Sequence, residues 1–149
     1  MTVTFCGHRE VLQATEVGNW LRNVVCELCR QGAKRFLVGG YGAFDRLAAS
    51  AVREAKAAFP NVTSILVLPY LDKRADLALY DETLYPPLES VPRRLAIVRR
   101  NTWMVAAAEV VVAYVLHDWG GAAKTLAYAK KQGKVVVSFS DGKTPRRDC

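Results

Sequence analysis

The sequence predicts a single α/β domain with a mostly parallel, five-stranded sheet and helices on both faces. Short runs of β-branched and aliphatic residues alternate along the chain with longer segments of helical spacing, which is the pattern of strands joined by crossover helices. With 149 residues, 51% of them hydrophobic, the chain is large enough for one core of ordinary size. Right-handed crossovers then place helices on both sides of the sheet.

The first half of the chain contains three predicted strands and two predicted helices. Each strand is a short, largely apolar run, and each helix has apolar residues at i, i+3, i+4 and i+7. The first helix closes near Gly32, and Pro60 breaks the second. The strands are expected at 3–6, 35–38 and 63–68, and the apolar helical stripes at 17–28 and 44–55.

The second half begins with a long connection, residues 69–92, which carries four prolines and several acidic and tyrosine residues. A connection of this length often forms a lid or contains a short helix, which we expect at 77–84. A helix over 93–107, a strand over 109–116, a helix from the glycine pair to Gln132 and a strand over 134–139 follow. We therefore assign residues 1–140 to the domain and 141–149 to a basic, flexible tail.

Charge and targeting signals narrow the function classes. The formal net charge of +7 suits an anionic ligand or weak nucleic-acid contact, and it is also ordinary for a solvated surface. The longest apolar run, 110–116, is too short to cross a bilayer, and the N-terminus has no secretory signal. We expect a cytoplasmic protein.

The four cysteines do not predict a metal site or a disulfide framework. Cys26 and Cys29 have the gap of a metal half-site, but no second close pair of Cys or His completes four ligands. We therefore expect no bound metal, and free thiols in a reducing compartment.

A glycine-rich stretch, Gly39, Gly40, Tyr41 and Gly42, follows the second predicted strand and opens a helix. Glycines leave backbone amides uncovered, and amides at a helix N-terminus attract phosphate. Asp45 in the first helical turn could offset the helix dipole, cap the backbone or bind a ribose hydroxyl. The alternative is a tight turn without a ligand.

A second turn of this kind, Gly120 and Gly121, follows the fourth predicted strand, with Lys124 and Thr125 in the next helical turn. The carboxyl ends of parallel strands meet at one edge of a sheet, so both turns are expected at one site. Trp119 and Trp103 could stack on a base, although packing is the favoured interpretation.

Further candidates come from two other segments. Gly7, His8 and Arg9 follow the first strand, where the arginine could bind phosphate and the histidine could act as a donor or as an acid or base. The alternative is a loop that caps the next helix. Arg100 and Asn101 lie in a predicted helix, where the asparagine could brace a loop or contact a ligand.

Six motifs follow one another in order along the chain: FCGHR at 5–9, GGYGAFD at 39–45, YDET at 80–83, YPPLE at 85–89, RRNTWMV at 99–105 and WGGAAKT at 119–125. Together they resemble the SLOG superfamily, which joins the Smf/DprA and LOG proteins, and most closely its small YpsA-like members. The resemblance spans nearly the whole chain except the tail. It implies a Rossmann-like sheet with a pocket for a nucleotide or nucleotide-derived ligand.

Three functions are compatible with these motifs. The leading one is a nucleotide-binding domain, with a sensor role. The second is a LOG-like nucleoside 5′-monophosphate phosphoribohydrolase that uses Asp45 or His8 as its catalytic group. Compared with the LOG motif, this chain has Val38 for proline, Ala43 for threonine and Arg46 for the required glutamate, which disfavours hydrolysis. The third is DNA binding. A homo-oligomer, most simply a dimer, is expected.

Overall fold

The computed structural model describes residues 1–71, 77–140 and 149, and within them it confirms the α/β prediction. Six strands, all parallel, form one sheet in the order β4-β3-β2-β1-β5-β6. The order reverses between β1 and β5, as in Rossmann-like sheets. The strands are β1 (Thr2–Gly7), β2 (Arg35–Val38), β3 (Thr63–Val67), β4 (Glu82–Leu84), β5 (Val110–Tyr114) and β6 (Val135–Ser138).

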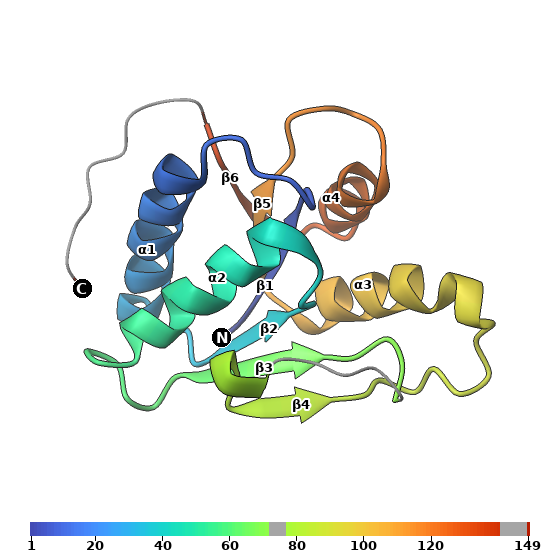
Figure 1. The fold of residues 1–149 in the computed structure, drawn as a ribbon, viewed down its shortest axis with the longest axis horizontal. Coiled ribbons are helices and arrows are strands. Elements are labelled where there is room, and N and C mark those ends of the chain that lie inside the picture. The colour runs from blue at the N-terminus through green and yellow to red at the C-terminus, as the bar shows by residue number, and fades with distance from the viewer. Residues whose placement is uncertain (72–76, 141–148) are drawn as a thin grey trace.

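Helices cover both faces of this sheet (Figure 1). One face carries two helices whose apolar residues join Val3, Phe5 and Val112 in the largest core cluster. The opposite face carries two helices that pack on Cys6, Val111 and Leu37. The first pair is α1 (Ala14–Arg30) and α2 (Gly42–Ala55), and the second is α3 (Ala96–Ala107) and α4 (Gly121–Lys131).

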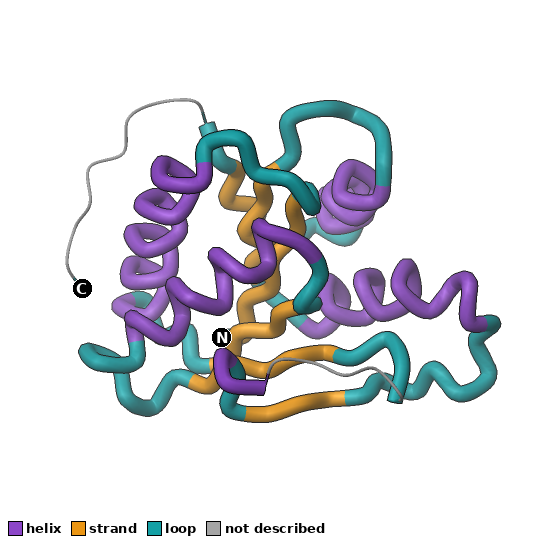
Figure 2. The backbone as a smooth tube through the Cα atoms, in the orientation of Figure 1, coloured by secondary structure: helices purple, strands orange, loops and turns teal. Residues whose placement is uncertain are grey.

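The helix expected at 77–84 is reduced to one short turn, and a sixth strand follows it, so the sheet has one strand more than predicted. A short 3-10 helix, η1 (Leu77–Leu79), is followed by β4, which pairs with β3 at the edge of the sheet (Figure 2). Asp81 fixes this pairing, because its carboxylate accepts a hydrogen bond from the Ser64 amide and pairs with Lys56. A three-residue strand is too short to show the alternation that identifies strands in a sequence.

The predicted helix over 93–107 is also divided in two. Its first turn is a 3-10 helix, η2 (Arg93–Leu95), which follows Pro92, and the α-helix begins at Ala96. Proline fixes its own backbone at a helix start and supplies no amide donor, which favours such a tight first turn.

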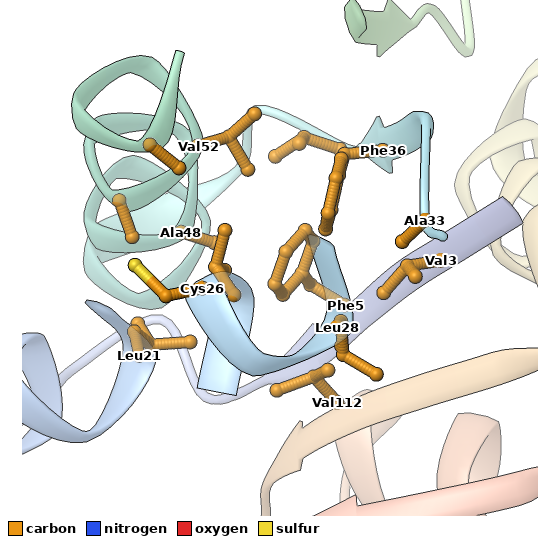
Figure 3. Packing of buried hydrophobic residues seen from close by; sticks show 14 of the residues in the cluster. Val3, Phe5, Leu21, Cys26, Leu28, Ala33, Phe36, Ala48, Val52 and Val112 are labelled. Atoms are coloured by element: carbon orange, nitrogen blue, oxygen red, sulfur yellow. The ribbon is translucent and has the colours of Figure 1, made fainter. Parts of the chain in front are cut away.

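The core lies mainly between the sheet and the α1–α2 pair (Figure 3). Phe5 stacks near Phe36 with ring centroids 6.1 Å apart and meets Phe44 of α2 edge-on at 6.5 Å. Because β1 and β5 are buried along their length, the sheet centre is rigid, and the loops at its carboxyl edge are held on a fixed base.

Two cysteines are paired, contrary to the expectation of free thiols. Cys26 of α1 forms a disulfide with Cys149, with Cα atoms 5.5 Å apart, whereas Cys6 and Cys29 are free and buried. A sequence separation of 123 residues gave no signal of this pairing. The expected tail at 141–149 lies, apart from Cys149, outside the described residues. None of the helices described is long and apolar enough to cross a membrane.

Candidate functional site

A cleft of about 630 Å³ opens at the carboxyl ends of β1 and β5, the two strands between which the strand order reverses. Its wall includes the loop after β1, the loop after β5, the start of α4 and the middle of α3. Ligands of open α/β sheets bind at this position, because helix N-termini and strand-end loops converge there. In Figure 1 this is the edge where the β1 and β5 arrowheads approach α4.

The first glycine turn, between β2 and α2, directs two of its backbone amides to internal acceptors. The Asp45 carboxylate accepts a hydrogen bond of 2.9 Å from the Tyr41 amide, and the Arg9 carbonyl accepts one of 2.7 Å from the Ala43 amide. Asp45 is buried, with 9% of its surface exposed. The carboxylate therefore already places a negative charge at the N-terminus of α2, where a ligand phosphate would otherwise bind.

Each glycine of this turn is explained by a close internal contact. A Cβ at Gly42, where φ is +88°, would lie 2.6 Å from the Arg9 Cα. A Cβ at Gly39 would lie 3.1 Å from the Arg100 guanidinium and 3.2 Å from an oxygen of Asp45. The absence of side chains thus lets the loop after β1 and the Arg100 side chain pack against the turn.

Arg100 is a buried cation that ties strand ends together. Its guanidinium donates from Nη1 to the carbonyls of Gly39 (2.8 Å) and Val67 (2.9 Å), and from Nε to the Asn101 side chain (2.9 Å). Burial lowers the pKa of Arg100 from its ordinary value, while the charge of Asp45 raises it. Arg100 is therefore a fixed positive charge on the cleft floor, held in place by its hydrogen bonds to the carbonyl groups at the ends of β2 and β3.

The loop after β1 lies across the first glycine turn. The Arg9 guanidinium lies 4.9 Å from the centre of the Tyr41 ring, a cation–π contact that leaves Arg9 exposed at the cleft. Gly7 has no room for a side chain, because a Cβ there would lie 2.2 Å from the Phe44 ring. Gly7 is thus required by core packing in addition to its position in the cleft wall.

The Cys6 thiol also lines the cleft but is not a nucleophile. It donates to the Ala122 carbonyl at 3.1 Å. Burial, helped by the negative charge of Asp45, raises the pKa of Cys6 to about 12. The thiol stays protonated at neutral pH, so it links β1 to the start of α4 rather than reacting with a ligand.

The second glycine turn, between β5 and α4, has open space around it. A Cβ at Gly121 would meet no atom within 4 Å, and Gly120 has only a ring carbon of His117 at 3.9 Å. The helix has no side-chain cap and no acidic residue in its first turn. The Thr125 hydroxyl donates to the Gly121 carbonyl, so it braces the turn. The N-terminal amides of α4 therefore lack the carboxylate that α2 has.

Three aromatic rings form a stack in the loop after β5 and the loop after β1. The His8 and His117 rings lie 4.1 Å apart with planes 18° from parallel, and His117 lies 3.8 Å from Trp119 at 13°. His8 also meets Tyr114 edge-on at 5.7 Å. The stack rises from the buried Tyr114 to Trp119, which is 69% exposed.

Hydrogen bonds define the protonation of both imidazoles. The Leu116 amide donates to His8 Nε2 at 2.9 Å, so this nitrogen carries no proton. His117 Nδ1 lies 2.8 Å from the Trp119 carbonyl, which can only accept, so this nitrogen carries a proton. Burial, and then the neighbouring His117, lower the pKa of His8. The stack is therefore neutral in His8 at pH 7.

Most of the residues predicted from the sequence meet in the cleft, and the ring stack was missed as a unit. The only signal for it was a tryptophan directly before a glycine pair. Among the predicted site residues, Gly39, Gly40, Gly42 and Lys124 do not line the cleft. Those that do are Gly7, His8, Arg9, Tyr41, Asp45, Arg100, Asn101, Gly120, Gly121 and Thr125.

Within residues 1–71, 77–140 and 149, no group of three His, Cys, Asp or Glu side chains is arranged to hold a metal ion. The donors near the cleft are instead amides, guanidinium groups and imidazoles, which suit an anion or a planar ring.

The fold and this site define the class of protein, a Rossmann-like α/β domain with its cleft at the point of strand-order reversal. Solved structures share this fold. DNA processing protein A (DprA) from Streptococcus pneumoniae matches with a TM-score of 0.68 at 17% identity, over 95% of this chain and 50% of that protein. DprA from Helicobacter pylori, which binds single-stranded DNA, matches with a TM-score of 0.66 at 17% identity, over 98% of this chain and 68% of that protein.

The molybdenum cofactor carrier protein from Chlamydomonas reinhardtii matches with a TM-score of 0.61 at 22% identity, over 92% of this chain and 74% of that protein. No family model and no curated protein matches the sequence. The chain thus has the Rossmann-like fold that DprA and the cofactor carrier have in common.

Proposed function

We propose that the protein binds a nucleotide or nucleotide-derived ligand in the cleft, with its phosphate at the N-terminus of α4, and that it acts as a sensor of that ligand. The observation that carries the proposal is the uncapped start of α4 at the cleft wall, with open space over Gly121. Amides at a helix N-terminus bind phosphate through hydrogen bonds and the helix dipole.

Positive charge in the cleft supports an anionic ligand. The Arg9 guanidinium is exposed at its mouth, and Arg100 is buried in its floor. In this proposal Arg9 pairs directly with the phosphate. Arg100, whose hydrogen bonds go to strand-end carbonyls, contributes a long-range positive potential, while Asn101 and Asp45 contact the sugar or base.

The first glycine turn has a different role in this proposal. Because Asp45 accepts from the Tyr41 amide, the turn seats Arg9 and Arg100 beside the cleft rather than binding phosphate through its own amides. This assigns phosphate binding to Gly120, Gly121 and the free amides of the first turn of α4, with Thr125 beside them in the cleft wall and Lys124 outside it.

The molybdenum cofactor carrier protein, which has the same fold, supports a small-molecule ligand, since its name describes it as the carrier of a cofactor. We further propose that the chain is a YpsA-like member of the SLOG superfamily, that it works in the cytoplasm and that it pairs as a homodimer. The order of the matched motifs along the chain supports the first of these assignments.

The LOG-like hydrolase ranks second. Its candidate base His8 has Nε2 already accepting a hydrogen bond, and its other candidate, Asp45, is buried against the Tyr41 amide. Arg46, at the position of the LOG glutamate, is exposed on α2. The test is release of free base from a nucleoside monophosphate. If the protein catalyses this release and Asp45→Asn abolishes it, the protein is a hydrolase and not only a sensor.

DNA binding ranks third, and one surface favours it. Arg93, Arg94 and Arg99 are exposed at the start of α3, and the Arg93 guanidinium lies 4.1 Å from the centre of the Tyr70 ring. DprA from Helicobacter pylori, with the same fold, binds single-stranded DNA. Retention of single-stranded DNA that falls steeply with salt, and falls further in Arg94→Ala, would support it.

The test is calorimetry of the full chain against nucleoside mono-, di- and triphosphates and the molybdenum cofactor. We expect binding of at least one phosphorylated ligand, weakened about tenfold or more by Gly121→Val, which covers the α4 amides. We expect this variant to fold, because Gly121 is exposed and a Cβ there meets nothing within 4 Å. Ala127→Val, an exposed position further along α4, is the matched control. Absence of binding across the panel would contradict the proposal.

A further inference from the structure

The stack of His8, His117 and Trp119 is an aromatic surface that core packing does not explain. His117 has both faces covered, by His8 on one side and Trp119 on the other. Trp119 has one face on His117, and no further ring among the described residues covers its second face. An indole that is 69% exposed beside a cleft leaves a large apolar surface in water.

The stack is held rigidly enough to act as a binding platform. The Leu116 amide fixes His8, and the His117 ring donates to the carbonyl of Trp119, which closes the loop after β5 on itself. Tyr114 supports the inner end edge-on. A ligand ring that adds to the stack therefore loses little of its binding energy in ordering the protein.

The position of Trp119 relates the platform to the phosphate site proposed above. Trp119 directly precedes Gly120 and Gly121, so its Cα lies at most two steps of about 3.8 Å from that of Gly121. A ribose between a base and its 5′-phosphate bridges a gap of this order. The loop thus presents an aromatic face and uncapped helix amides within the reach of one mononucleotide.

We infer that Trp119 is the stacking surface for the planar heteroaromatic ring of the ligand, a nucleobase or a related fused heterocycle, and that His8 and His117 support it from behind. The inference rests on the proposed function. Every nucleobase can stack on an indole, so Trp119 would favour ligands that contain a flat ring over those that do not. Discrimination between one base and another would come from other groups in the cleft. A cationic ligand is disfavoured here by Arg9 at the same cleft and by the net charge of +7.

The test compares two probes on the full chain by calorimetry, adenosine 5′-monophosphate, which has a ring, and ribose 5-phosphate, which lacks one. We expect the wild type to bind the nucleotide more tightly. Trp119→Leu should lower the affinity for the nucleotide by about tenfold to a hundredfold, without changing the affinity for ribose 5-phosphate. Trp119→Phe should restore most of the loss. Because the Trp119 side chain is largely exposed, we expect neither substitution to change the stability of the fold.

A second pair of variants tests the support. His117→Ala removes the middle ring and should lower the affinity for the nucleotide nearly as much as Trp119→Leu does. His117→Phe keeps a ring in the stack and should retain most of the affinity. Val135→Ala, an exposed position at the opposite end of the sheet, is the control.

The outcomes separate this inference from the proposed function. Equal affinity for both probes, unaffected by Trp119→Leu, would overturn the stacking assignment and leave phosphate binding intact. Failure of both probes, and of guanosine, cytidine and uridine monophosphates, would overturn both. Loss of a protein–protein association in Trp119→Leu, with nucleotide affinity unchanged, would instead make the platform a protein contact and overturn the inference.

Discussion

Two glycine turns at the same edge of the sheet, one before α2 and one before α4, have similar sequences and opposite environments. Before α2 the backbone amides of Tyr41 and Ala43 bind Asp45 and the Arg9 carbonyl, and side chains or backbone crowd the glycines. Before α4 the helix has no acidic residue in its first turn and no atom within 4 Å of a Cβ at Gly121.

The difference shows that glycine content alone does not define an anion site. A glycine can be present because a ligand approaches the backbone, or because another part of the chain does. In this protein Asp45, three positions after Gly42, already offsets the positive end of the α2 dipole. The second turn has Lys124 at the same spacing from Gly121 and therefore no such negative charge. The first turn builds the cleft wall, and the second is open to a ligand.

Replacing Gly42 with alanine gives the largest expected effect. The backbone there has φ of +88°, and a Cβ would overlap the Arg9 backbone at 2.6 Å. Strain of about 1–3 kcal/mol and overpacking of about 1–3 kcal/mol predict a loss of about 4 kcal/mol in the free energy of unfolding, measured with urea. Gly121→Ala is the control and should be neutral or stabilising by about 0.5 kcal/mol. Equal effects at the two glycines would remove the distinction between the turns.

Replacing Arg100 with methionine comes next. The change keeps a long side chain but leaves the carbonyls of Gly39 and Val67 without their buried donor, at about 1–3 kcal/mol each. We expect a loss of about 3 kcal/mol in the free energy of unfolding. Arg99→Met, the exposed neighbour, should change it by less than about 0.5 kcal/mol. A stable Arg100→Met protein that has lost only ligand affinity would make Arg100 a ligand contact instead of a brace.

The alternation of strands and helices was readable from the sequence because each central strand is a nearly continuous apolar run, as in Val110–Tyr114. It predicted that the candidate residues meet at one edge of the sheet, and the cleft lies at that edge. The roles of Gly39 and Gly42 were not readable, because they depend on Arg100 and Arg9, which lie far away in the chain. β4 was missed because three residues held by Asp81 carry no periodic pattern.

The ring stack gives a smaller effect that depends on pH. Because burial and the adjacent His117 lower the pKa of His8 below its ordinary value of 6.5, the unfolded chain takes up a proton at this residue more readily than the folded chain. Stability should therefore fall as pH decreases from about 7 through 6.5 toward the folded pKa, and then level off. Arg9, Glu10, Asp45 and His117 line the same cleft, so the comparison needs a variant that changes His8 alone.

His8→Gln supplies that variant, since its amide oxygen can accept from the Leu116 amide and does not titrate. Melting temperatures at pH 7.5 and pH 5 should differ less for His8→Gln than for the wild type. Superimposable pH profiles would show that His8 is not held neutral by the stack.

Amide chemical shifts test the central claim most directly. The ¹⁵N-labelled protein would be titrated with inorganic phosphate and then with adenosine 5′-monophosphate, and the backbone amide resonances of the two turns followed together. We expect the amides of Gly121, Ala122 and Ala123 to shift with saturation, while those of Tyr41 and Ala43 stay in place because Asp45 and Arg9 already accept from them. Saturable shifts at Tyr41 and Ala43, with the α4 amides unmoved, would contradict the account.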